Sequence, residues 1–426
     1  MKYCFREAIQ WIVIGITLIG LPAIAWSDDL DARVARVLKS TPLIDGHNDL
    51  PWQFQRRSRN QLSGLNLRSD LSQLAQPTDT DIPRLRRGQV GGLFWSVYVP
   101  IRGYDGEQGD VQAVIAQIDL VKRMVAKYDD TFELTLTPAA TREAHQRGKI
   151  ASMIGIEGGH AIQNSLATLR GLFDLGARYM TLTHSKGLSW ADSATDDPRV
   201  GGLTPFGEQV VLEMNRLGML VDLAHVSTET MKDALRITRS PVIFSHSSAW
   251  SVTNHDRNVP DDILRAVAAN RGVVMVNYLT SYVSEPMRLY RMAYEAREAE
   301  IKASHPASQR DSVLARWVSE NPAPEVTLYD VADHIDHLRA VAGIQAIGLG
   351  ADFDGMPPGP VGLEDVSTYP ALFKELLIRG YSDQDIAKIA GENILRAWSE
   401  AEAIAQRLQQ LEPPREDQPA PESAGS

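Results

Sequence analysis

The stretch Leu43-Ile44-Asp45-Gly46-His47-Asn48-Asp49 is a short apolar run that ends on side chains able to bind a metal ion or move a proton. Five more apolar runs end in the same way, on Glu157, His184, His225, His246 and Asp352. Because the carboxyl ends of parallel strands meet at one edge of a sheet, this pattern indicates that six strands deliver polar side chains to one place. It favours a metal-dependent hydrolase.

Two further apolar runs, 92–99 and 272–277, bring the expected strands to eight. The runs do not alternate strictly between apolar and polar residues, as is typical of strands covered on both faces. Helical patterns separate them. They are expected at 109–129, 166–175, 208–217, 228–235 and 260–269. Eight strands alternating with helices predict an α/β fold, a (β/α)8 TIM barrel, whose chemistry lies at the C-terminal ends of the strands.

One segment interrupts this alternation. Residues 284–326 separate the seventh expected strand from the next barrel helix and include a charged run, 294–300, that is typical of a solvated helix face. We expect a helical insertion here that covers the mouth of the site or contacts a second subunit. The catalytic domain is expected to span 26–411.

The N-terminus has the layout of a secretory signal peptide. Lys2 and Arg6 precede an apolar stretch that closes on small residues at Ala25, so we expect residues 1–25 to be removed. The alternative is an uncleaved segment that holds the protein at the inner membrane, although the apolar stretch is short for a membrane span. The only cysteine is Cys4, so the mature chain has none, which suits an exported, periplasmic protein without disulfides.

Composition describes an ordinary globular chain, 43% hydrophobic and 23% charged. The net charge of −11 argues against nucleic acid and anionic membrane surfaces as partners. Residues 412–426 are rich in Pro, Glu, Ser and Ala, which predicts a disordered tail.

The polar residues that end the six apolar runs, called the run-end residues below, suit a pair of metal ions, since imidazole and carboxylate are ligands that zinc prefers. His47 and Asp49 are two residues apart, so an extended backbone points both the same way. We assign these two to one metal ion, and His225 and His246 to a second. Glu157 offers two oxygens and would bridge the ions, which together can activate one water molecule.

The remaining histidines carry weaker signals. His334 and His337 lie about one helical turn apart and could chelate a metal, but their segment continues into an apolar helix, so the surface of a barrel helix is expected. His160 is close to Glu157 in the sequence and is expected to shape its loop.

Seven motifs in this chain resemble those of the membrane (renal) dipeptidase family. They are Asp45–Pro51, Ile156–His160, Leu182–Ser185, Val221–Ser227, Ser245–Ala249, Arg257–Asp262 and Gly350–Gly355. They follow the family's order and run from about Ile44 to Asn393, nearly the whole mature chain. The resemblance implies a dinuclear zinc dipeptidase on an amidohydrolase-like barrel, with two Zn²⁺ per subunit and a homodimeric assembly.

The resemblance also implies a role for each site residue. His184 would reach the substrate carbonyl and stabilise the developing oxyanion, and Arg257 would clamp the C-terminal carboxylate with its planar fork. Tyr282 falls where the family has a substrate-contacting tyrosine. Asp352 would orient a zinc-bridged hydroxide and pass its proton to the leaving amine, with Glu157 as the bridging carboxylate. The implied reaction is hydrolysis of dipeptides with a free C-terminal carboxylate, and acceptance of a D-residue at that position is left open.

The chain also departs from animal members of the family. It has no disulfides and no lipid-anchor signal, so it resembles the bacterial branch. Lys186 stands where animal members have a cysteine after Thr-His-Ser, and the 284–326 insertion is longer, which bears on substrate preference.

Two alternatives remain. The first is another two-metal hydrolase, such as an amidase, lactonase or phosphotriesterase. Many barrel hydrolases use His-x-His on the first strand and a modified lysine as the bridge, whereas this chain offers His47-Asn48-Asp49 and Glu157. The second is an exported binding protein or inactive relative, against which the intact set of ligands, His184 and Asp352 argue.

Overall fold

The computed structural model of the protein describes residues 23–101 and 110–417. The predicted signal peptide lies outside this range except for residues 23–25, which begin the helix α1 (Ala23–Ser40). Within the described ranges, no helix is long and apolar enough to cross a lipid bilayer.

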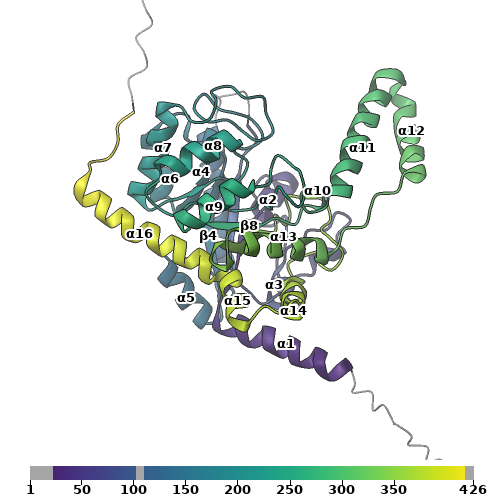
Figure 1. Cartoon of the computed structure of the whole chain (residues 1–426), viewed down its shortest axis with the longest axis horizontal. Helices are drawn as coiled ribbons and strands as arrows, with labels where there is room; N and C mark the ends of the chain where they lie inside the picture. The colour runs from purple at the N-terminus through teal and green to yellow at the C-terminus, as the bar shows by residue number, and fades with distance from the viewer. Residues whose placement is uncertain (1–22, 102–109, 418–426) are drawn as a thin grey trace, which may run out of the picture.

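Eight parallel strands close into a barrel, which confirms the predicted fold (Figure 1). They are β1 (Leu43–Asn48), β2 (Val90–Tyr98), β4 (Ile150–Glu157), β5 (Ala177–Thr181), β6 (Leu220–Asp222), β7 (Ile243–Phe244), β8 (Val273–Val276) and β9 (Ile347–Leu349). Each strand pairs with the next in this series, and β9 pairs with β1 to close the ring. A further short strand, β3 (Phe132–Leu134), pairs with β4 outside the ring and was not expected from the sequence.

The expected helices are present with small shifts at their ends. They are α4 (Asp110–Lys127), α6 (Leu166–Asp174), α7 (Pro205–Leu217), α8 (Thr228–Ile237) and α9 (Asp261–Asn270). The hydroxyl of Ser227 caps α8 by accepting a hydrogen bond from the Thr230 N–H. The other helices that the argument uses are α2 (Leu50–Ser58), α3 (Ile82–Arg87), α10 (Thr280–Val283), α13 (Leu328–Val341) and α16 (Asn393–Leu411).

Large side chains fill the barrel beneath the site. Phe94, Met153 and Tyr179 are fully buried there, and the ring of Trp398 from α16 packs 5.9 Å from that of Phe94. A Cβ atom at position 155 would stand 2.0 Å from the Tyr179 ring, so only glycine leaves room for this tyrosine. The interior is therefore a packed floor on which the site rests.

The pairings of β1 with β9 and of β6 with β7 contain the fewest residue pairs of any in the ring. One residue pair, Asp45 with Leu349, joins β1 to β9, whereas seven pairs join β2 to β4. Beyond the paired residues, Asp352 N–H donates to the His47 carbonyl and Asp49 N–H to the Phe353 carbonyl. Loops, more than strand pairing, therefore hold these two strand ends together.

A buried segment, residues 78–84, braces this junction from outside. The Thr80 hydroxyl accepts a hydrogen bond from the side chain of Asn48, at 2.8 Å, and Asp79 bonds to Asp354. The Arg84 guanidinium, 3% exposed, fixes the segment by donating to Asp81, at 2.7 Å, and to the Thr78 carbonyl, at 2.6 Å. One segment thus contacts the last residue of β1 and the loop that follows β9.

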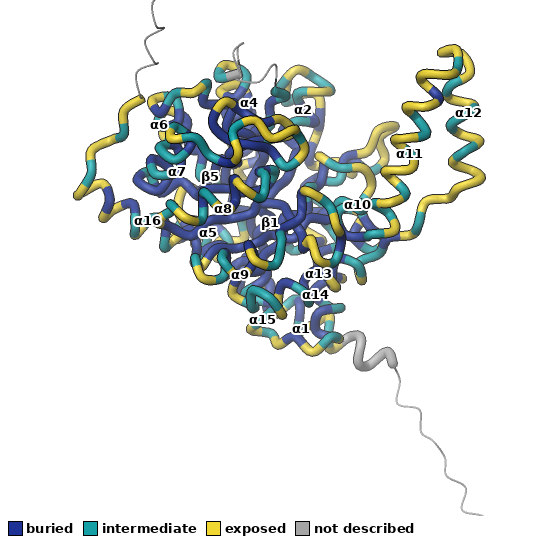
Figure 2. Tube along the Cα trace, turned by 45° about the horizontal axis from the view of Figure 1, so that its top comes forward, coloured by how far each residue is buried: buried dark blue, intermediate teal, exposed yellow. Residues whose placement is uncertain are grey.

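The stretch between β8 and α13 contains α10 and two longer helices, α11 (Glu285–Ser304) and α12 (Ala307–Glu320). The two longer helices form a hairpin that projects away from the barrel, and most of it is exposed or half-buried (Figures 1 and 2). Tyr290, Tyr294 and Trp317 pack against one another between the two helices, with ring centroids 5.8 to 6.5 Å apart.

The predicted disordered tail begins with residues that contact the barrel helices. Arg415 donates its backbone N–H to Glu213 in α7, at 3.1 Å, and Asp417 accepts a hydrogen bond from the Leu166 N–H at the start of α6, at 2.6 Å. Polar contacts of this kind leave no apolar signature in the sequence, which is why residues 412–417 were expected to be disordered. Residues 418–426 lie outside the described residues.

Candidate active site

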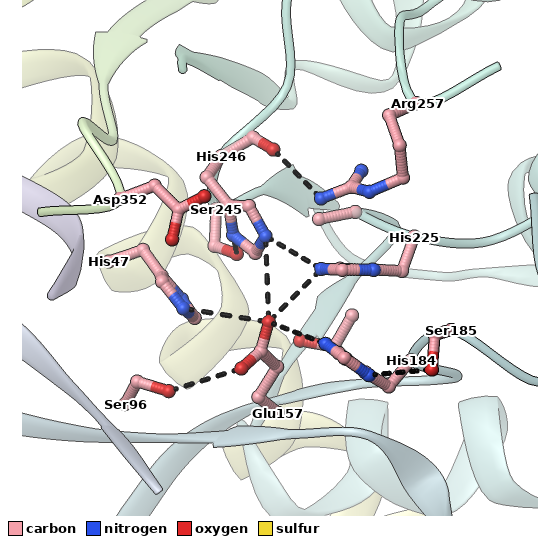
Figure 3. Close-up of polar contacts among 12 residues, drawn as sticks. His47, Ser96, Glu157, His184, Ser185, His225, Ser245, His246, Arg257 and Asp352 are labelled. Atoms are coloured by element: carbon pink, nitrogen blue, oxygen red, sulfur yellow. Dashed lines mark hydrogen bonds and ion pairs between the residues drawn. The ribbon is translucent and has the colours of Figure 1, made fainter. Parts of the chain in front are cut away.

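The predicted run-end side chains converge at the C-terminal end of the barrel, around Glu157 (Figure 3). The Nε2 atom of His225 lies 3.0 Å from Glu157 Oε1, and those of His47, His184 and His246 each lie 3.6 Å from the same oxygen. Asp49 Oδ2 lies 3.3 Å from His47 Nε2, and Asp352 completes a group with these two residues. Side chains up to 305 residues apart in the chain therefore share one centre.

Several of these residues stand just past the strands rather than on them. His184, His225, His246 and Asp352 follow the last residues of β5, β6, β7 and β9. His225 and Asp352 have φ angles of 66° and 70°, in the left-handed region that non-glycine residues seldom adopt. Such backbone conformations are typical of functional sites, where the surrounding structure fixes a side chain in a required direction.

Glu157 is a buried anion surrounded by imidazoles. Burial alone would raise its pKa, but His47, His184 and His225 lower the pKa well below its ordinary value. Burial, together with Arg257 and neighbouring histidines, lowers the pKa values of His225 and His246 well below the usual range. These two rings are therefore neutral, the form in which an imidazole nitrogen can bind a metal.

Three polar side chains that the sequence interpretation missed orient the histidines. The Tyr179 hydroxyl lies 2.9 Å from Nδ1 of His47, and the Ser245 hydroxyl lies 2.8 Å from Nδ1 of His246. Asp222 in turn accepts from the Ser245 hydroxyl at 2.6 Å. All three residues lie inside the apolar runs already singled out, so a polar residue within such a run was the available signal.

Asp352 is held on one side by Asn277, whose Nδ2 donates to its Oδ2 at 3.1 Å. Burial raises the pKa of Asp352 well above its ordinary value; His47 opposes this, and Asp49 and Glu157 add to it. Gly355 lies against this pair of carboxylates: a Cβ atom there would stand 2.1 Å from Asp49 Oδ2 and 2.7 Å from Asp352 Oδ1. Glycine is therefore required where the loop after β9 passes over the site.

A cavity of about 410 Å³, a size that suits a small ligand, is lined by five of the predicted site residues: Asp49, Glu157, His184, His225 and Asp352. Arg257 lines it too and is only 2% exposed. Its guanidinium makes two long contacts of 3.5 Å, to the Ser247 hydroxyl and the His246 carbonyl, and its Nε has no hydrogen-bond partner. Among the described residues no carboxylate forms an ion pair with it. The ring of Tyr282 from α10 lies 5.6 Å from Arg257 Cζ.

The chemistry of the donor set fits a metal centre. Three groups have ligand atoms within 4.8 Å of one another: His47–Glu157–His246, Glu157–His184–His225 and His47–Asp49–Asp352. Glu157 is common to the first two groups and His47 to the first and third, so the bridging role of Glu157 stays a prediction. The buried Nε2 of His47 faces Asp49 Oδ2 at 3.3 Å and Glu157 Oε1 at 3.6 Å without a well-aligned hydrogen bond among the described residues, as expected of a metal-ligand atom.

The other histidines lie outside the centre. His334 is fully buried in α13, where its Nδ1 accepts a hydrogen bond from the Ala249 N–H, so the expectation of a surface position was wrong for this residue. His337 pairs with Asp261 at 2.8 Å. His160 Nε2 lies 2.8 Å from the Val99 carbonyl, joining the loop after β4 to the end of β2.

Comparison with known proteins adds the family. The family profile described as membrane dipeptidase, peptidase family M19, matches residues 31–412. The structure resembles the probable dipeptidase PvdM from Pseudomonas aeruginosa, with 22% identity, a TM-score of 0.75, and coverage of 88% of this chain and 99% of that one. It also resembles a dipeptidase AC of family M19, at 25% identity and a TM-score of 0.69, over 85% of this chain and 99% of that one.

A third similar structure is a metallopeptidase from Rhodobacter sphaeroides, liganded with a phosphinate mimic of the dipeptide L-Ala-D-Ala. The two chains are 24% identical, the TM-score is 0.68, and the match covers 85% of this chain and 99% of that one. Because the family profile spans nearly the whole chain around the metal-ligating cluster, this protein belongs to the membrane dipeptidase family, M19, and is a metallopeptidase.

Proposed function

We propose that this protein hydrolyses dipeptides that carry a free C-terminal carboxylate, with two zinc ions at the Glu157 cluster. The observation that carries the proposal is Arg257. Its buried guanidinium has no acidic partner in the part of the chain that the structure describes, and it lines the same cavity as Asp49 and Glu157. Burying an unpaired cation is costly, and a substrate carboxylate would offset that cost. A binding group for carboxylate beside a hydrolytic centre suits a short peptide.

The ligands for zinc would be His47, Asp49, Glu157, His225 and His246. Zinc bound there would supply Lewis acidity and a water whose pKa falls to about 7, so that a nucleophile is available near neutral pH. The nucleophile would be the zinc-bridged hydroxide that the family resemblance implies, and Glu157, which is common to two of the candidate ligand groups, supports this part of the proposal.

His184 would assist at the substrate carbonyl. It lines the cavity, and burial lowers its pKa, so the ring is neutral and can donate one N–H. Its Nδ1 lies 3.2 Å from the Ser185 hydroxyl, and Nε2 faces Glu157 and the cavity. A donor in this position stabilises negative charge that develops on the carbonyl oxygen during attack.

Asp352 would move the proton. Held by Asn277 and next to Asp49, it can accept a proton from the attacking water and deliver it to the nitrogen of the scissile bond. The C–N bond then breaks, and the products are two free amino acids.

A D-residue at the C-terminal position belongs to the proposal as well. Arg257 would recognise the carboxylate and not the side chain, so it does not by itself select one stereochemistry. The Rhodobacter sphaeroides metallopeptidase, whose structure holds a mimic of L-Ala-D-Ala, supports including D-residues among the substrates to be tested.

The test is release of free amino acids from L-Ala-L-Ala and L-Ala-D-Ala by the purified protein, before and after removal of metal by a chelator and after return of zinc. We expect hydrolysis that disappears with the chelator and returns with about two zinc ions per chain. Failure of the zinc-loaded protein to cleave any dipeptide would overturn the proposal. Cleavage of lactones or phosphotriesters in its place would favour the alternative two-metal hydrolase.

Homodimer formation and export to the periplasm stay predictions. Light scattering of the purified protein tests the first, and cell fractionation combined with N-terminal sequencing of the mature chain tests the second.

A further inference from the structure

We propose that a second hollow beside the active site, walled by α10 and α11, receives the side chain of the substrate's C-terminal residue and selects large apolar or aromatic side chains there. This inference rests on the dipeptidase function proposed above. It assigns a role in substrate choice to the segment that follows β8, which lies outside the regular β/α alternation.

The hollow adjoins the catalytic cavity and is larger, at about 760 Å³. Leu279, Tyr282 and Pro357 line both spaces. Leu279 and Tyr282 lie at and in α10, after β8, whereas Pro357 lies in the loop after β9. The shared residues therefore come from two separate segments, and we infer that a passage between the two spaces runs between these segments.

Arg257 places the C-terminal residue of a dipeptide at this passage. Its guanidinium would hold the carboxylate and lies 5.6 Å from the ring of Tyr282, one of the boundary residues. The Cα atom that bears the side chain is bonded directly to that carboxylate carbon. The scissile carbonyl must lie on the side of this Cα atom that faces His184 and Glu157. The side chain of the C-terminal residue is therefore directed past Tyr282.

The walls of the hollow fit an apolar guest. Met287, Tyr290 and Met292 of α11 contribute thioether and aromatic surface, which adapts to guests of different shape. Two arginines also line it, but both have partners on the same helix: Arg288 donates to Glu285 at 2.8 Å, and Arg291 to Glu295 at 3.1 Å. With these charges paired, Asp256 is the lining charge for which no ion pair is found among the described residues, and it disfavours acidic side chains.

The experiment compares kcat/KM for L-Ala-X and L-Ala-D-X, with X as Ala, Leu or Phe, in the zinc-loaded enzyme. Two variants fill the hollow: Ser281→Trp, next to Tyr282, and Ala323→Trp, on its exposed rim. Val318→Trp is the matched control, because it introduces the same tryptophan side chain in α12 at a position that does not line the hollow. Tm of each variant is measured to identify misfolding.

In the wild-type enzyme we expect kcat/KM for the dipeptide with X = Phe to equal or exceed that for X = Ala, in the L-Ala-X series, the L-Ala-D-X series or both. The filling variants should lower the Phe-to-Ala ratio about tenfold or more, since pocket contacts of this size discriminate by 10-fold to 200-fold. The control should leave the ratio unchanged. The inference would be overturned if the wild-type enzyme rejected the Phe and Leu dipeptides in both series. It would also be overturned if a folded filling variant lost kcat/KM equally for the Ala and Phe dipeptides. In either case, continued hydrolysis of L-Ala-Ala would leave the proposed function intact.

Discussion

Asp79 and Asp354 each accept a hydrogen bond from the backbone N–H of the other, at 2.9 Å in both directions. Asp354 stands two residues after Asp352. Asp79 belongs to the buried segment 78–84, whose Thr80 hydroxyl accepts a hydrogen bond from Asn48, the residue between His47 and Asp49. The exchange therefore fixes the loop that carries the proposed proton carrier relative to the strand that carries two proposed metal ligands. Neither residue needs to touch the substrate for this effect.

Removing the Asp79 side chain should therefore impair turnover more than binding. In Asp79→Ala the Asp354 N–H loses its acceptor, and small displacements of a reacting group cost up to about 100-fold in rate. We expect kcat for L-Ala-Ala to fall by about 10-fold to 100-fold with little change in KM or in bound zinc. Asp79→Asn keeps an acceptor oxygen and should recover most of kcat. Equal losses in the two variants would show that the exchange does not position Asp352.

Arg257 should control the use of the substrate carboxylate. Arg257→Ala removes a charge-assisted contact in a buried site, for which we expect a loss of about 2 to 4 kcal/mol, or 30-fold to 1000-fold in kcat/KM for dipeptides. Zinc content, measured by elemental analysis, should stay at the wild-type level. C-terminally amidated dipeptides serve as the control, because they lack the carboxylate and should lose little. Loss of zinc from the variant would instead give Arg257 a part in the metal centre.

Ser245 should affect zinc affinity through His246. In Ser245→Ala the hydroxyl between Asp222 and His246 Nδ1 is missing, so the ring is less well oriented. Changes of this kind weaken metal binding by about 10-fold to 100-fold, measured by competition with a chelator. Ser152→Ala is the control: that serine is also buried on a strand, but its hydroxyl has no hydrogen-bond partner among the described residues. An unchanged affinity in Ser245→Ala would exclude the orienting role.

His334 should make folding stability depend on pH below neutrality. Burial lowers its pKa from 6.5 to about 3 in the folded chain. As the pH falls through 6.5, the unfolded chain binds a proton that the folded chain does not, so stability is lost between about 6.5 and 3. Between pH 7 and pH 5 this loss amounts to about 2 kcal/mol.

His334→Asn keeps a hydrogen-bond acceptor near the Ala249 N–H without a titrating ring. Denaturant unfolding at pH 7 and pH 5 should show a stability loss about 2 kcal/mol smaller in the variant than in the wild type. Metal release at low pH affects both proteins and cancels in the difference. Parallel losses in the two proteins would show that His334 does not account for the pH dependence.

Much of the fold could be predicted because each barrel strand is covered on both faces. Runs such as 153–156 contain only apolar residues and glycine, and the polar residue that follows each run marks the C-terminal end of the barrel. The strand β3 was missed because Phe132–Leu134 is too short to have a detectable pattern. It pairs with only three residues of β4.

The site could be predicted where a metal-binding side chain lies on a regular strand. His47 and Glu157 lie on strands, so their positions in the barrel follow from the two-residue repeat of a strand and from the length of the apolar run. His225 and Asp352 depend on left-handed turns after their strands, which no repeat in the sequence encodes. In the Asp79–Asp354 exchange each carboxylate accepts from a backbone N–H 275 residues away, and no local pattern in the sequence marks such a contact.

The single residue pair between β1 and β9 also bears on how the enzyme is made. Asp49 and Asp352, which meet across that junction, are 303 residues apart, so most of the chain must be synthesised before they can approach. Such distant contacts form late and slowly in folding. A partly made chain therefore has no competent hydrolytic centre, and peptidase activity begins only when the ring is closed.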